Sequence, residues 1–336
     1  MQKRNTSLVS RKGVSRSFWK ARPVFVTGVT GFVGSWLAAR LVREGTRVVG
    51  LAWGKTAGSN FNRLGLAKKI TVVRGRLENF PLLQRIIQKH SIEIVYHLGA
   101  QTIVGVANQS PLPTFKANIE GTWNLLESCR GGKNVRAVIV ASSDKAYGVH
   151  KKLPYQENFP LQAEYPYDVS KACADLLARS YFKTYGLPVV VTRFANIYGP
   201  GDLHFSRIIP DTIRSILQGK HPIVRSDGTP ERDYLYIDDV VELYLLLAQR
   251  IKQVQGEAFN AGWNHPISVR ALVDIILRLA GRADLQPKIL GSGTPHGEID
   301  RQWLDARKAK RPLGWKPRVS LEEGLRRTLA WHRVLS

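Results

Sequence analysis

The chain has 336 residues, of which 43% are hydrophobic and 9% aromatic, so it can bury a large core in one large or two modest domains. No apolar run approaches the ~20 residues of a membrane helix, and the first residues lack the apolar stretch of a secretory signal, which predicts a cytoplasmic protein without a membrane span. The formal charge of +24 raises the question of nucleic acid, but the basic residues are spread along the chain without a binding motif, so we expect no nucleic-acid partner.

The N-terminal segment has the most one-sided charge. Residues 1–22 carry seven basic and no acidic side chains, and we expect them to form a flexible basic tail. The two cysteines, Cys129 and Cys173, are too few for a disulfide framework and lack the spacing of metal ligands. They predict buried, reduced thiols and no metal site.

Short apolar runs rich in β-branched residues recur through the first half of the chain. The first run, 23–28, precedes a segment with apolar residues at helical spacing, which Gly45 ends. Later runs follow, with helix-like segments between most of them, at 47–52, 70–75, 92–100, 135–143 and 188–194. This alternation predicts an α/β chain in which helices cover both faces of a parallel sheet, the doubly wound Rossmann fold.

After about residue 195 the pattern becomes irregular. Helical spacing returns near 206–219, 237–250, 268–281 and 321–333. We therefore expect a Rossmann domain over 23–195, to which later segments return, and a smaller lobe formed mainly by 196–336. That lobe is expected to bind substrate, because ligands of such sheets bind in the crevice outside the carboxyl ends of the strands.

A glycine-rich turn joins the first strand to the first helix. Gly28, Gly31 and Gly34 permit a sharp bend and a close approach of the backbone to a pyrophosphate, which the helix N-terminus attracts. In this strand-turn-helix context the spacing predicts a dinucleotide site. The second strand ends at Ala52 without the carboxylate that often binds the adenosine ribose, and Lys55 follows, so we expect NAD but leave NADP open.

A tyrosine and a lysine four residues apart point to redox chemistry. Tyr167 and Lys171 fall on one face of a predicted helix, where the amine and a nicotinamide cation are expected to lower the phenol's pKa from ~10 towards neutrality. Tyr147 and Lys151 have the same spacing, but they lie in a loop and we regard that match as chance. The Tyr167 pair is preferred because it begins a helix some twenty residues after the strand end that carries Ser143.

Seven motifs extend this pattern along the chain, in the order TGVTGFVG, HLGAQ, NIEGTWNLLE, SSDKAYG, YDVSK, TRFANIYGPGD and ERDYLYIDDVV. With them the chain resembles the extended short-chain dehydrogenase/reductase superfamily over essentially residues 22–333. The resemblance implies a Rossmann domain with bound NAD(P), a nucleoside-diphosphate sugar as substrate, and a homodimer built through a four-helix bundle.

Within the superfamily, Ser142, Ser143, Asp144 and Lys145 resemble the CDP-glucose branch of the 4,6-dehydratases, whereas the dTDP-glucose branch has Asp-Glu. Such an enzyme oxidises C4 of the hexose, eliminates water across C5 and C6, and returns the hydride to C6. The resemblance implies that Tyr167 takes the O4 proton, Lys171 tunes it and holds the ribose, and Ser143 binds O4. Asp144 then protonates the departing C6 hydroxyl.

Lys145 is left with two roles, removal of the C5 proton or stabilisation of the enolate. A lysine must be neutral to act as a base, and its reference pKa is ~10.4, although burial near other cations can lower it. A plain surface ion pair between Asp144 and Lys145 is the alternative without a catalytic role.

The resemblance also implies contacts to the ligands. Cofactor contacts besides Tyr167 and Lys171 are expected at Gly28, Gly31, Phe32, Val33, Gly34, Leu77, Leu98 and Ala100. Substrate contacts are expected at Asn196, Arg207 and Arg232, with an exposed helix-start arginine as the alternative for Arg207. The chain departs from its relatives at Arg76, where an aspartate near the adenine is usual, and at Ala52.

The sequence is compatible with two other functions. A C4 epimerase of UDP-sugars needs the same tyrosine but no Asp-Lys pair. A non-catalytic scaffold that senses NAD(P) or binds nucleic acid is suggested by the charge of +24, although a complete catalytic set argues against it.

Overall fold

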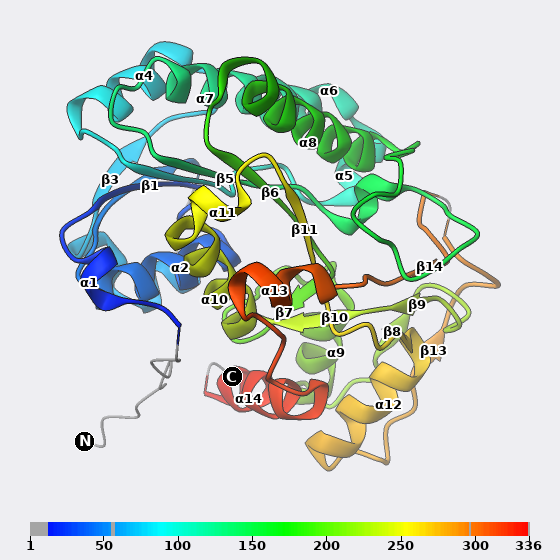
Figure 1. Cartoon of the computed structure of the whole chain (residues 1–336). Coiled ribbons are helices and arrows are strands. Elements are labelled where there is room, and N and C mark those ends of the chain that lie inside the picture. Colours follow the sequence, from blue (N-terminus) through cyan, green and yellow to red (C-terminus); the bar gives the residue numbers. More distant parts are fainter. Residues whose placement is uncertain (1–12, 55–57, 296, 335–336) are drawn as a thin grey trace.

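The computed structural model describes residues 13–54, 58–295 and 297–334 (Figure 1). Within these residues the central sheet has seven parallel strands in the order β11-β6-β5-β4-β1-β2-β3. The strands are β1 (Pro23–Thr27), β2 (Arg47–Ala52), β3 (Thr71–Arg74), β4 (Ile94–His97), β5 (Ala137–Ala141), β6 (Val189–Phe194) and β11 (Ala258–Ala261). The order reverses between β1 and β4, which places the crevice for ligands there. The doubly wound sheet predicted from the sequence is confirmed.

Helices cover both faces of this sheet (Figure 1). One layer consists of α4 (Phe80–Lys89), α7 (Gly121–Arg130) and α8 (Pro166–Tyr185), and the other contains α2 (Phe32–Arg43), α10 (Ile237–Gln249) and α11 (Ile251–Val254). Successive residues of β1 pack against opposite helix layers. Phe25 packs in the cluster with α4, α7 and α8, whereas Val24 and Val26 pack with α2 and α10. Every residue of β1 is buried, which explains its uninterrupted apolar run.

Shorter elements connect these layers. They are α3 (Asn60–Arg63), η1 (Leu66–Lys68), α5 (Val104–Gln109), α6 (Pro111–Phe115), the π-helical turn η2 (Lys116–Glu120) and the 3₁₀ turn η3 (Asp144–Tyr147). The α8 helix has clear sequence signals at both ends, since Pro166 occupies its first turn and Gly186 closes it with a φ of 66°.

The C-terminal half forms a smaller lobe below the sheet in Figure 1. Its helices are α9 (Ile208–Leu217), α12 (Val269–Ala280), α13 (Lys310–Leu313) and α14 (Leu321–Arg333), with the 3₁₀ turn η4 (Arg307–Ala309). Its short strands are β7 (Asn196–Tyr198) paired with β10 (Tyr234–Tyr236), β9 (Glu231–Arg232) between β12 (Ile267–Ser268) and β14 (Arg301–Gln302), and β8 (Ile223–Val224) paired with β13 (Lys288–Ile289). The division of the chain at residue 195 stays a prediction, but β11 and α10 do return to the main sheet.

The predicted basic tail needs a correction. Residues 1–12 lie outside the described residues, but residues 13–22 are not a free tail. Arg16–Trp19 form the helical turn α1, Trp19 is fully buried, and the Arg22 guanidinium forms an ion pair with Glu93. The large apolar surface of Trp19 outweighs the charge of its neighbours, so this segment packs on the Rossmann core.

None of the helices in the described ranges is both long and apolar enough to cross a bilayer.

Candidate active site

The glycine turn forms a cradle that side chains would fill. Gly28 has a φ of 66°, and a Cβ there would lie 2.8 Å from the Cα of Gly99. A Cβ on Gly34 would lie 2.2 Å from the carbonyl oxygen of Gly28, while Gly31 caps the N-terminus of α2. Phe32 and Val33 follow as the first residues of that helix. The tight turn and the free N-terminus of a twelve-residue helix therefore fit the pyrophosphate of a dinucleotide.

The ends of β1 and β4 are joined beside this cradle. Thr27 Oγ1 accepts hydrogen bonds from the backbone N–H groups of Leu98 and Gly99 at 3.1 and 2.9 Å, and it lies 3.0 Å from His97 Nδ1. Burial and the charge of Lys171 lower the pKa of His97 to about 3, so this imidazole is neutral near pH 7. The network fixes the segment that contains Leu98 and Ala100, both predicted cofactor contacts.

The third side of the cradle is apolar. Leu77 is buried, and its side chain approaches two glycines so closely that a Cβ on Gly121 would lie 2.5 Å from it and one on Gly99 would lie 3.2 Å from it. Leu77 thus lies beside the glycine turn, in agreement with its expected place near the cofactor.

The adenosine end differs from that of an enzyme with an acidic ribose contact. Trp53 follows β2 and is 66% exposed, and the Arg76 guanidinium lies 4.8 Å from the centroid of its ring. Arg76 also forms an ion pair with Glu78 at 2.8 Å. Lys55, named above as a candidate phosphate contact, lies outside the described residues. An aromatic ring and a guanidinium, instead of the carboxylate that often binds the adenosine ribose, therefore lie near the end of β2.

Lys171 is fixed against the end of β5. Its Nζ donates a hydrogen bond to the carbonyl oxygen of Ala141 at 2.8 Å, and Ser142 Oγ donates to the carbonyl oxygen of Lys171 at 3.1 Å. Burial lowers the pKa of Lys171 to about 8. The helix is held further by Asn118, which donates to Ser170 Oγ at 2.9 Å from the π-helical turn η2. Sequence reasoning missed this role of Asn118, although the residue lies in a motif that carried the resemblance.

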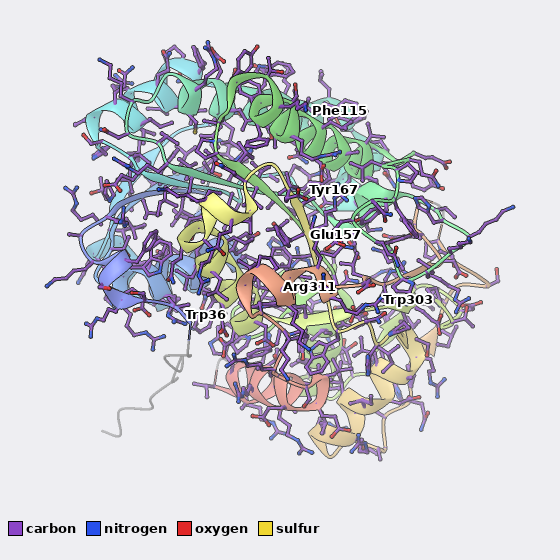
Figure 2. All side chains as sticks on the ribbon, viewed as in Figure 1. Trp36, Phe115, Glu157, Tyr167, Trp303 and Arg311 are labelled. Atoms are coloured by element: carbon purple, nitrogen blue, oxygen red, sulfur yellow. The ribbon has the colours of Figure 1, made fainter. Side chains whose placement is uncertain are left out.

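Tyr167 lies in the interior between α8 and the C-terminal lobe (Figure 2). Burial raises its pKa to about 12, and the charge of Arg207 and a hydrogen bond with Ser143 oppose the rise. The lowered pKa expected from the sequence depends on the nicotinamide cation as well as on Lys171, and it stays a prediction. A cationic ligand at this site would act in the opposite direction.

The 3₁₀ turn η3 places the next three candidates. Ser143 caps this turn, and its Oγ donates to Asp144 Oδ1 at 3.0 Å. Asp144 is buried, and its Oδ2 has no hydrogen-bond partner among the described residues. Burial raises the pKa of Asp144, and nearby polar groups such as Gln302 and Lys145 oppose the rise without cancelling it. A raised pKa favours the acid form of a carboxyl, the form that can donate a proton.

Lys145 points to a carboxylate from the other lobe. Its Nζ donates to Glu298 Oε2 at 2.8 Å, and the Arg232 guanidinium lies 3.5 Å from the same oxygen. The expected alternative, a plain ion pair between Asp144 and Lys145, is wrong, because no such pair forms in the structure: Lys145 pairs with Glu298, 153 positions away. Sequence reasoning did not find Glu298, since it lies in a loop without periodicity.

The remaining substrate candidates are arranged less tightly. Arg207 caps α9, forms an ion pair with Asp202 at 3.1 Å, and is close enough to Tyr167 to influence its pKa. Asn196 begins β7 and is exposed. The structure thus brings Tyr167, Ser143 and Asp144 together with charged groups of the smaller lobe, whereas no side-chain hydrogen bond or ion pair joins Asn196 to them within the described residues.

Asp168 is a second residue that the sequence reasoning missed. It follows Tyr167 directly, is 1% exposed, and has an Oδ1 without a hydrogen-bond partner among the described residues. Burial raises its pKa to about 7, and the charge of Lys145 limits the rise. Its position beside the expected tyrosine was the signal that could have found it.

Tyr147 and Lys151, the second match to the tyrosine-lysine spacing, do not form a site. Tyr147 is fully buried, donates to Asn260 Oδ1 at 2.8 Å, and accepts a hydrogen bond from Arg193 at 2.7 Å. Lys151 is exposed in a loop. The interpretation of this spacing as chance agrees with the structure.

The chain is similar to known nucleotide-sugar enzymes in both sequence and structure. The family model described as GDP-mannose 4,6 dehydratase matches residues 25–328. The CDP-glucose 4,6-dehydratase of Salmonella typhimurium is 33% identical, with 96% of this chain and 93% of that protein covered. The solved UDP-glucose 4-epimerase of Thermotoga maritima, with UDP-glucose, is similar with a TM-score of 0.86 and 30% identity, covering 93% of this chain and 99% of that one. The dTDP-glucose 4,6-dehydratase of Bacillus anthracis, in complex with NAD, has a TM-score of 0.83 and 27% identity, covering 94% and 97%.

Proposed function

Because the chain belongs to the GDP-mannose 4,6 dehydratase family of nucleotide-sugar enzymes, we propose that it is a 4,6-dehydratase that converts CDP-glucose to CDP-4-keto-6-deoxyglucose with loss of water. The family match confirms the resemblance that the sequence motifs indicated. The observation that carries the finer proposal is the pair Asp144 and Lys145 at the end of β5, next to the helix that begins with Tyr167. The similarity to the Salmonella CDP-glucose enzyme supports it.

We infer that the cofactor is NAD, as in the Bacillus anthracis relative, with NADP left open by Ala52. When bound, the nicotinamide supplies a hydride acceptor for C4 and a hydride donor for C6. The chain's own contribution is the glycine cradle for the pyrophosphate, with Leu77 and Leu98 beside it, and Lys171 held at the end of β5.

The residues around η3 divide the proton chemistry of the proposed reaction. Tyr167 accepts the O4 proton of the hexose as the phenolate, a form that a nicotinamide cation beside it would favour, and Ser143 holds that oxygen through its hydroxyl. Lys171, fixed to Ala141, brings positive charge to the same place. Asp144 donates its proton to O6 as water leaves, because burial favours its acid form. Arg232 and Arg207 lie on the lobe side and are suited to the diphosphate.

Incubation with a panel of nucleotide hexoses tests the proposal. We expect CDP-glucose to give a 4-keto-6-deoxy product, identified by NMR and by a mass loss of one water, at a rate above those with dTDP-, GDP- or UDP-glucose. A 4-keto-6-deoxy product from another nucleotide alone would correct the base and keep the reaction.

A C4 epimerase of UDP-sugars is the second candidate, and the Thermotoga maritima structure favours it. It requires Tyr167 but not an acid at position 144. Inversion at C4 with no dehydrated product would replace the dehydratase proposal with this one.

We also propose that the protein is a homodimer that pairs through α7 and α8. These neighbouring helices lie on the outside of the molecule (Figure 1), where Trp123 on α7 and Leu176 on α8 are 43% and 54% exposed. Leu112 on the adjoining α6 is 61% exposed. Apolar side chains on two adjacent helices are suited to a four-helix contact with a second copy.

Replacing Leu176 by Arg is expected to convert the dimer to a monomer, because a charge would be buried at the centre of the paired helices. Size-exclusion chromatography with light scattering measures the mass. Replacement of exposed Leu290, outside these helices, by Arg is the matched control and is expected to leave the mass unchanged. A wild-type protein that is monomeric at all concentrations would contradict the proposal.

A further inference from the structure

The carboxylate of Glu298 connects two cations of the site. Its Oε2 lies 2.8 Å from Lys145 Nζ and 3.5 Å from Arg232 Nη2. The side chains of Lys145 and Arg232 are 12% and 11% exposed, whereas that of Glu298 is 31% exposed. Glu298 therefore lies on the accessible side of this charged group, and the cations lie behind it.

We propose that Glu298 is the base that removes the C5 proton, and that Lys145 acts as an ammonium ion which holds this carboxylate and stabilises the enolate. This inference rests on the proposed 4,6-dehydratase function. In the step, the C5–H bond breaks and its proton goes to Glu298. The electron pair forms the C5–C6 double bond, the C6–O bond breaks, and Asp144 supplies the proton with which O6 leaves as water.

Lys145 is a poor candidate for the base in this arrangement. Its short contact with Glu298 is a charge-assisted hydrogen bond in which the ammonium form donates. An amine must give up a proton before it can accept another, and here Nζ is engaged as a donor to Glu298 Oε2 at 2.8 Å. An ammonium ion in a mostly buried position is instead suited to stabilise the negative charge that develops on the substrate.

The other carboxylates that face Lys145 are less suited to be the base, because burial raises their pKa. Asp168, from α8, is 1% exposed and its pKa is raised to about 7, so it is only partly ionised near neutral pH. Asp144, from η3, is also buried, and burial raises its pKa, which suits an acid. Burial alone would also raise the pKa of Glu298, but Lys145 and Arg232 outweigh burial and lower it. Glu298 is thus the accessible carboxylate that is ionised near pH 7.

Glu298→Gln separates the proposed step from the others. The amide keeps the size of the side chain and an oxygen for Lys145, but it cannot take a proton near neutral pH. We expect at least a ~100-fold loss of deuterium incorporation at C5 from deuterated water, measured by mass spectrometry on recovered substrate and product. Oxidation at C4 should persist, seen as a 4-ketoglucose nucleotide trapped by borohydride.

Two further variants complete the experiment. Glu298→Asp retains the carboxylate and should recover part of the C5 exchange. Glu231→Gln is the matched control, because Glu231 has the same 31% side-chain exposure and an ion pair with Arg301 on the same small sheet, and it should leave both steps unchanged.

The outcomes are distinct. Equal losses of C4 oxidation and C5 exchange in Glu298→Gln would mean a structural role and overturn the proposal. Retained exchange in Glu298→Gln with lost exchange in Lys145→Gln would assign the base to Lys145. A wild-type protein that dehydrates no nucleotide hexose would instead defeat the proposed function itself, whatever these variants do.

Discussion

Tyr167→Phe is expected to lower kcat on the nucleotide sugar by between about 100-fold and 10,000-fold. Tyr167, as the phenolate, is the group at the N-terminal turn of α8 that we propose accepts the O4 proton, and phenylalanine cannot accept a proton. Phenylalanine keeps the ring packing of this buried position, and the hydroxyl is neutral in the protein alone because burial raises its pKa to about 12. Folding should therefore be little affected, and steady-state rates with thermal unfolding measure the two effects separately.

Tyr181→Phe is the matched control on the same helix. Its hydroxyl donates to Glu127 at 3.1 Å, at the surface between α7 and α8, so its loss should leave the rate unchanged. Unchanged activity of Tyr167→Phe on the nucleotide sugars would remove the tyrosine from the mechanism. A wild-type protein with no measurable activity on any nucleotide sugar, but with RNA binding that falls steeply with salt, would instead favour the non-catalytic scaffold.

Asp144→Asn is expected to slow dehydration by about 100-fold to 10,000-fold while oxidation at C4 continues. The acid that protonates O6 is then missing, so the 4-ketoglucose nucleotide should accumulate and the 4-keto-6-deoxy product should fall. The change should cost little stability, because an amide keeps the size of the buried side chain and avoids burying a charge. NMR of the quenched reaction distinguishes the two products.

The same variant separates the two candidate reactions. An epimerase has no water to eliminate, so Asp144→Asn would then leave turnover largely intact, and that outcome would contradict the dehydratase. Asp274→Asn, which removes an exposed ion pair with Arg270 on α12, controls for the loss of a carboxylate elsewhere.

Much of the fold could be predicted because its local signals are strong. The run predicted at 47–52 is β2 with the same bounds, and the helices predicted at 237–250 and 321–333 are α10 and α14 within one residue at each end. Buried strands and amphipathic helices have periods that are visible in sequence alone. Trp19 was misjudged because a single large apolar residue among charges has no period, and its burial depends on a distant core.

The site was predictable where its residues are near in sequence. Tyr167 and Lys171 share a helix face, and Ser143 to Lys145 follow one strand, so the motifs are local. Glu298 meets Lys145 only because the smaller lobe folds back over the end of β5, and no spacing rule expresses that contact. The environment of Asp168 was equally hidden, since burial rather than identity sets its pKa.

The return of β11 to the main sheet has a consequence for how the protein assembles during synthesis. β6 is buried along its whole length, and its outer edge pairs with Ala258–Ala261. The ribosome synthesises these residues more than sixty positions after the end of β6. Until then β6 is an open, apolar sheet edge, the kind of surface on which chains aggregate. A fragment that stops at residue 195 would keep that edge permanently. The two halves are therefore expected to need each other to become soluble, even if each binds its own ligand.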